Sequence, residues 1–126
     1  MVITYLQHTD PLLPYYPASS HTFVRGAAST IDRDFGFIGS YLFHGAITFH
    51  VLHHHKSSIP FYHAAEASRA MRTVMGSSYI ADMESSYLGA WWRNYRTLRW
   101  VENREAEGDG VFFFEREKLD GKVKPL

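Results

Sequence analysis

The sequence predicts a mainly α-helical chain that ends in a short β-hairpin. Three segments, at about 40–55, 63–75 and 84–98, carry apolar residues at helical spacing. Near the C-terminus, two short runs rich in β-branched and aromatic residues flank a turn at 108–110. With 126 residues the chain can form one domain with a modest core but not two, so residues 1–126 are treated as one unit.

The first half of the chain is expected to place a loop before its helices. Residues 1–7 are largely apolar, and the three prolines that follow, up to Pro17, predict an extended loop because proline cannot donate a backbone hydrogen bond. A short helix is predicted from Thr22 to Ile31. The next helix is predicted from about Ser40 to His55 and should end at the segment 57–60.

The second half is expected to form two helices and the hairpin. One helix should begin near His63 and end at Met75, because Gly76 suits a C-terminal stop. The other should span Glu84 to Leu98. Its apolar face is formed by Leu88, Trp91, Trp92 and Tyr95. The hairpin strands are predicted at 99–102 and 111–115.

The composition excludes several classes of function. Thirteen basic residues balance thirteen acidic ones, so bulk charge does not indicate a nucleic-acid partner. The chain has no cysteine, so any metal must be bound by nitrogen and oxygen atoms. The longest stretch without a formal charge, 35–55, has the length of a membrane span, but it contains five histidines and three glycines. We therefore predict no transmembrane span within the chain.

The run His50-Val51-Leu52-His53-His54-His55 is the strongest functional signal. His50, His53 and His54 have the spacing H-x-x-H-H, and on a helix a rotation of about 100° per residue places their rings within an arc of about 100°. Such a cluster indicates an all-imidazole site for iron, copper or zinc, the alternative being an exposed polar face. Val51 stands where H-E-x-x-H peptidases carry glutamate, which argues against peptidase chemistry.

The remaining polar residues give weaker signals. His63 is either a helix-start residue or a residue that contacts the metal-binding histidines without binding the metal itself. Asp32 and Asp34 flank Arg33, and we interpret them as local ion-pair or capping residues.

Nine short motifs follow one another along almost the whole chain: ITYLQHTDP (3–11), TIDRDFGFIG (30–39), LFHG (42–45), HVLHH (50–54), SIPFY (58–62), EAS (66–68), VMG (74–76), WVE (100–102) and GVFFF (110–114). Together and in this order they resemble the C-terminal region of membrane fatty acid desaturases, especially fungal delta-12 (oleate) and omega-3 acyl-lipid desaturases. The resemblance implies that the fold is the C-terminal cytosolic portion of a histidine-box desaturase.

The resemblance also implies an activity and a cofactor. Members of this family are oxidoreductases of the endoplasmic reticulum membrane. They use a histidine-bound di-iron centre, O2 and electrons from cytochrome b5 to insert a cis double bond into an acyl chain of a phospholipid or acyl-CoA. The implied reaction is delta-12 desaturation, oleate to linoleate, at the cytosolic face. By this resemblance His50, His53 and His54 form the third histidine box and bind metal, and His8 is an additional ligand.

The first two histidine boxes of the family have no counterpart in this sequence. The resemblance thus implies a desaturase fragment with an incomplete di-iron site that is inactive alone. A fatty acid hydroxylase or acetylenase fragment on the same scaffold is a near alternative. A small soluble protein that binds metal through its histidine cluster is a more distant one. A desaturase fragment should expose apolar faces at 35–49 and around Trp91 and Trp92, whereas a free-standing protein should bury them.

Overall fold

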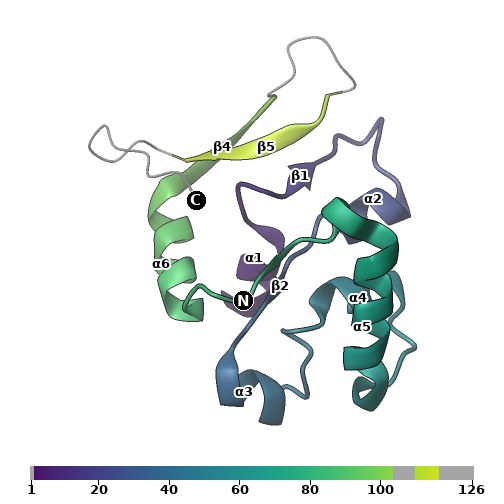
Figure 1. The fold of residues 1–126 in the computed structure, drawn as a ribbon. Helices are drawn as coiled ribbons and strands as arrows, with labels where there is room; N and C mark the ends of the chain where they lie inside the picture. Colours follow the sequence, from purple (N-terminus) through teal and green to yellow (C-terminus); the bar gives the residue numbers. More distant parts are fainter. Residues whose placement is uncertain (1, 104–109, 117–126) are drawn as a thin grey trace.

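The computed structural model describes residues 2–103 and 110–116, and helices predominate in this part of the chain (Figure 1). The helices are α1 (Val2–His8), α2 (Phe23–Ala28), α3 (Gly36–Tyr41), α4 (His50–His55), α5 (Phe61–Met75) and α6 (Tyr87–Thr97), with a 3-10 turn η1 (Gly76–Ser78). The strands are β1 (Pro14–Tyr15), β2 (Asp32–Arg33), β3 (Ala81–Asp82), β4 (Leu98–Asn103) and β5 (Phe112–Arg116). The prediction of a mainly α-helical chain is confirmed.

Two small sheets connect segments that are far apart in the sequence. The first has the order β1-β5-β4, with antiparallel pairing on both sides of β5. The predicted C-terminal hairpin is therefore confirmed, although residues 108 and 109 of its turn lie outside the described residues. The second sheet pairs β2 with β3 in parallel, placing Asp32 opposite Ala81 and Arg33 opposite Asp82. The three-stranded sheet lies at the top of Figure 1 and α3 at the bottom.

Three of the predicted helices form close to the expected positions. α2 is shorter than predicted, and the Thr22 hydroxyl accepts a hydrogen bond from the Arg25 amide at 3.2 Å as its N-terminal cap. α5 ends where glycine was expected to end it, because Gly76 adopts a φ of 53° that side-chain-bearing residues avoid. α6 begins at Tyr87, three residues later than predicted.

The prediction of one continuous helix from about Ser40 to His55 is wrong. The chain leaves α3 after Tyr41 and begins α4 only at His50. Between them His44 and Gly45 have φ values of 48° and 76°, in the left-handed region that ends right-handed helices. A Cβ atom at Gly45 would lie 2.9 Å from the ring of Phe49, so glycine also provides space here. The consequence is that His50 is the first residue of its helix.

A small core joins the two segments that carry the histidines. Leu6 of α1, Ile47 of the loop before α4, and Tyr87 and Ala90 of α6 are buried together. Two buried amides reinforce this junction: Gln7 Nε2 donates to the Ile47 carbonyl at 2.9 Å, and Asn94 Nδ2 donates to the carbonyl of Thr9 at 2.8 Å. The end of α1 is thereby fixed against both α6 and the approach to α4.

Large apolar side chains remain on the surface. Three residues of the predicted apolar face of α6 are exposed, namely Leu88, Trp92 and Tyr95, whereas Trp91 is partly buried and packs against the core. Tyr87, Ala90 and Asn94 are buried. α3 exposes Phe37 (74%), and three further apolar residues in and next to it, Ile38, Tyr41 and Leu42, are also exposed. The exposed apolar faces expected of a desaturase fragment are therefore present in part, since Ile47 is buried and Phe35, Phe43 and Trp91 pack against the core. Among the described residues, no helix combines the length and the apolar character needed to cross a membrane.

Candidate metal centre

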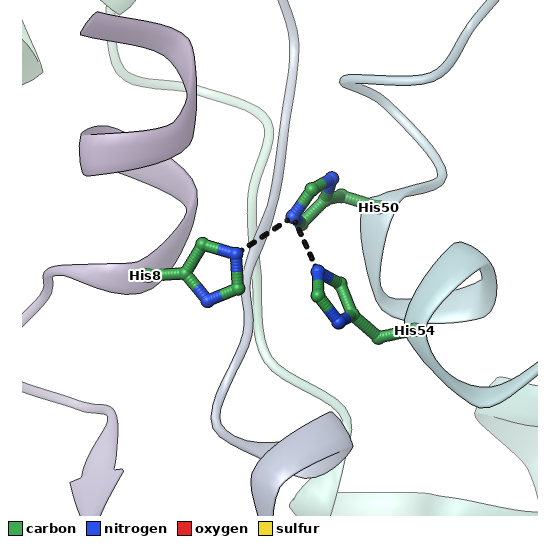
Figure 2. Close-up of side chains that lie close together, drawn as sticks. All are labelled: His8, His50 and His54. Carbon is green, nitrogen blue, oxygen red and sulfur yellow. Dashed lines mark hydrogen bonds between the residues drawn. The ribbon is translucent and has the colours of Figure 1, made fainter. Parts of the chain in front are cut away.

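Three histidine side chains converge between α1 and α4. His8 is the last residue of α1, and His50 and His54 lie one turn apart on α4. His50 Nε2 is 3.2 Å from His8 Nε2 and 3.0 Å from His54 Nε2. The candidate ligand atoms of the three rings all lie within 4.8 Å of one another. Figure 2 shows the rings pointing toward one another from their two helices.

This geometry fits a metal ion better than hydrogen bonds among the rings. A ring nitrogen carries either one N–H or one lone pair, so His50 Nε2 cannot form a good hydrogen bond with both neighbours at once. Three lone pairs can instead point at one cation. Nitrogen separations of 3.0 and 3.2 Å match two ligands about 2.1 Å from one ion at angles of about 90–100°. Three imidazoles are a suitable donor set for one metal ion, although His8 and His54, whose ligand atoms lie within 4.8 Å of each other, would have to be no more than about 4.2 Å apart to bind it together.

The surroundings hold the three imidazoles in the neutral form that binds metals. Burial and, to a smaller extent, the neighbouring His54 and His8 together lower the pKa of His50 to about 4, although a backbone hydrogen bond at Ala46 opposes the shift. Burial also lowers the pKa of His8 and, together with its histidine neighbours, that of His54. Because a protonated imidazole has no lone pair to give, these shifts keep the ligands available at neutral pH.

His53 lies apart from this cluster although it belongs to the same sequence motif. Its ring centre is 6.3 Å from that of His50 and 5.9 Å from that of His54, and the residue is exposed. It lines a mostly apolar cavity of about 290 Å³ together with His44 and Phe61. Of the three histidines in the H-x-x-H-H motif, only His50 and His54 therefore belong to the cluster. His8 is its third member.

The other sequence-predicted histidines have separate surroundings. The His63 side chain is 61% exposed at the start of α5, and its Nδ1 lies 4.0 Å from Glu66 Oε2. The structure gives no contact between His63 and the trio in the part of the chain that it describes. His55 Nδ1 lies 2.9 Å from the carbonyl of Val51 on its own helix.

Sequence reasoning missed the role of β2 behind the trio. A local ion-pair or capping role was expected for Asp32 and Asp34 around Arg33, and among the described residues the structure records ion pairs of Arg33 and Asp32 only with residues distant in the sequence. Asp32 Oδ1 accepts the amide hydrogen of Val51 in α4 at 2.9 Å. Arg33 forms ion pairs of 2.6 Å with both Asp10 and Asp82. The signal that could have found them is three adjacent charges, Asp-Arg-Asp at 32–34, in a stretch otherwise poor in charge. Only Asp34 acts locally, accepting the amide hydrogen of Gly36 at 2.8 Å.

The sequence is similar to one part of several lipid-modifying enzymes. It is 48% identical over 97% of its length to an oleate hydroxylase of Claviceps purpurea. It is 45% identical over 90% of its length to a delta(12) fatty acid desaturase of Mortierella isabellina, and 41% identical over 90% to an omega-6 fatty acid desaturase, endoplasmic reticulum isozyme 2, of Glycine max. The chain spans only 27% to 30% of the length of these relatives. No protein-family model and no solved structure matches it.

Proposed function

This chain is related to one segment of the fatty acid desaturase family, and on that premise we propose that it supplies the third histidine box of a membrane delta-12 desaturase. The convergence of His8, His50 and His54 carries the proposal, because it joins two of the matching motifs into one metal site. The substrate would be an oleoyl chain of a phospholipid or acyl-CoA. The product would be the corresponding linoleoyl chain.

The trio would hold one iron of a di-iron centre. Bound iron supplies the capacity to activate O2 for removal of hydrogen from an unactivated methylene, which side chains alone cannot do. The contribution of this chain is to present three neutral imidazoles and to keep them oriented. The partly buried positions of His8, His50 and His54 limit the access of water and protons to those nitrogens.

His53 would bind the second iron. Its ring centre lies 6.3 Å from that of His50 and 5.9 Å from that of His54, it is exposed, and it belongs to no group of three candidate ligands in the described part of the chain. The missing ligands would come from the first two histidine boxes in other parts of the enzyme. This division of one box between two metals explains why three histidines in one turn of helix do not converge, and it makes the chain inactive alone.

The surface supports a position against the membrane. The exposed aromatic and aliphatic side chains of α3 and α6 would be covered by lipid or by the membrane helices of the whole enzyme. Arg96 lies 5.7 Å from the ring centre of Trp92, a combination suited to the anionic surface of a bilayer. We place the chain on the cytosolic face of the endoplasmic reticulum, where its arginines could also meet the acidic electron donor cytochrome b5.

A second candidate is a fatty acid hydroxylase segment. The 48% identity to the oleate hydroxylase of Claviceps purpurea favours this reading as strongly as the desaturases favour the first. Both reactions begin on the same acyl chain and differ in the product, which the remaining parts of the enzyme would decide. The exposed apolar faces disfavour the third reading, a small free-standing metal-binding protein.

A chimaeric enzyme tests the proposal. The 113-residue region of the Mortierella isabellina desaturase that matches this chain is replaced by the chain and expressed in a host that makes oleate but no dienoic acid. Gas chromatography with mass spectrometry of the lipids should show linoleate. His50→Ala should abolish the product, whereas His55→Ala, next to the box but with no ligand role, should retain it.

Each outcome has a distinct meaning. A 12-hydroxy acid in place of linoleate would support the hydroxylase reading. A membrane-inserted chimaera that makes neither product, while the parent desaturase is active, would contradict both. Expression of the chain alone should give no new fatty acid.

A further inference from the structure

The two residues of β2 connect the two segments that carry the metal-binding histidines. Asp32 and Arg33 are almost completely buried, with 0% and 1% of their surface exposed. Successive side chains of a strand point to opposite sides, so one residue can reach α4 while its neighbour reaches α1. Accordingly, Asp32 forms a hydrogen bond with α4, and Arg33 forms one with α1.

On one side, Asp32 holds the start of α4. Its Oδ1 accepts the Val51 amide hydrogen at 2.9 Å, immediately after His50. The residue before α4, Phe49, provides no side-chain cap, so Asp32 takes this role from a distant part of the sequence. Its other oxygen accepts a hydrogen bond from the Tyr79 hydroxyl and lies 3.5 Å from Arg72 Nη2, which fixes the carboxylate in place.

On the other side, Arg33 holds the end of α1. Its Nε donates to the carbonyl of Leu6 at 3.2 Å, and its Nη2 pairs with Asp10 at 2.6 Å. These two partners stand two residues before and two residues after His8. The ion pair of Nη1 with Asp82 anchors the guanidinium to β3. The Ile31 amide adds a hydrogen bond to the Gln7 carbonyl at 3.1 Å.

We propose that Asp32 and Arg33 are positioning residues of the metal centre, a clamp that brings His50 and His54 on α4 into register with His8 on α1. Neither residue touches the ring nitrogens, so both act through the backbone of the ligand-bearing segments. The inference rests on the metal site assigned under the proposed function, and it concerns the assembly of that site rather than the reaction.

The test is Co²⁺ binding by the chain, held in detergent micelles to cover its apolar faces and followed by the visible absorption of the bound ion. Asp32→Ala removes the cap on α4 and should weaken Co²⁺ binding by roughly 10- to 100-fold, the range found for residues that orient metal ligands. Asp32→Asn keeps one oxygen for the Val51 amide and should restore most of the affinity. Asp34→Ala, the matched acidic control that bonds only locally, should bind like the unsubstituted chain.

A purely structural role for Asp32 would lower the melting temperature without changing affinity or spectrum in the folded population, which circular dichroism identifies. Wild-type Co²⁺ affinity in folded Asp32→Ala would therefore overturn the clamp and leave the proposed function standing. An equal loss in Asp34→Ala would also overturn it.

If Asp32→Ala does not fold, the Co²⁺ affinity of Arg33→Lys provides the test. Lysine keeps the positive charge but cannot contact Leu6, Asp10 and Asp82 at the same time. About a tenfold loss supports the clamp, and unchanged affinity contradicts it. Failure of the unsubstituted chain to bind Co²⁺ would overturn the clamp and the metal site together, whereas the chimaera tests the function separately.

Discussion

Replacing His54 by alanine should weaken Zn²⁺ binding by this chain far more than replacing its neighbour His53. The two substitutions remove the same side chain from adjacent positions of α4, so effects on helix stability and on net charge are closely matched. They differ in position, because His54 Nε2 lies 3.0 Å from His50 Nε2, whereas the His53 ring centre lies 6.3 Å from that of His50. Comparing the two variants therefore tests whether metal binding depends on the cluster of His8, His50 and His54 or on the three histidines of the sequence motif.

The size of the difference follows from the geometry. Residues that only orient a ligand change metal affinity by roughly 10- to 100-fold. Loss of one of three direct ligands should exceed that range, so His54→Ala should lose at least about 100-fold, or roughly 2.8 kcal/mol at about 1.4 kcal/mol per factor of ten. His8→Ala should lose a similar amount. His53→Ala should stay within roughly threefold of the unsubstituted chain, a change too small to indicate a lost ligand.

Isothermal titration calorimetry of the chain with Zn²⁺ measures these affinities directly. A loss in His53→Ala as large as that in His54→Ala would refute the geometry and restore the trio expected from the motif alone. Unchanged binding in His8→Ala would exclude α1 from the site. In the active chimaera, by contrast, His53→Ala should abolish product formation, because His53 would there bind the second iron.

Three further predictions concern the framework around the site. Leu6→Ala, at a fully buried position, should lower the free energy of unfolding in urea by about 3–5 kcal/mol, and Leu42→Ala on the exposed surface by less than about 0.5 kcal/mol; similar losses in both would refute the assigned core. Gly45→Ala should cost about 1–2 kcal/mol in the same assay because of its left-handed conformation, and a stabilising effect would contradict the helix break. Burial alone would raise the pKa of Asp82, but hydrogen bonds from Ser85 and the charge of Arg33 lower it. The Asp82 carboxylate therefore contributes stability above about pH 4 that is lost as the pH falls through its lowered pKa. Asp82→Asn should flatten the fall of the urea midpoint over that acidic range, and an unchanged slope would argue against the ion pair.

Local patterns predicted those elements whose signals lie within a few residues. Gly76 ends α5 as expected, and the hairpin strands pair as expected, because a glycine at a helix end and short runs of β-branched and aromatic residues act over short distances. The break between α3 and α4 was not predicted. The uncharged apolar stretch around His44 reads as one helix, and only the packing of Gly45 against Phe49 shows why the chain bends there.

The grouping of histidines at the candidate metal site was predicted in part, for a similar reason. Helical spacing places His50 and His54 on one face, and the structure agrees. The spacing of residues on one helix cannot predict His8 as a ligand, because His8 lies 42 residues before His50 in the sequence. Its role was expected only from the family resemblance. The connections of Asp32 to Val51 and of Arg33 to Asp82 span 19 and 49 residues, so nothing in the local sequence specifies them.

The position of β5 in the three-stranded sheet affects the order in which the fold can form during synthesis. β5 lies between β1 and β4, so β1 has its hydrogen-bonding neighbour only after residues 112–116 have left the ribosome. The bond from Asn94 to Thr9 likewise joins residues 85 positions apart. Contacts of such high sequence separation form slowly because a long loop must close first. The segment that follows His8 thus gains its partners in β5 and α6 only after nearly all of the described chain has been made.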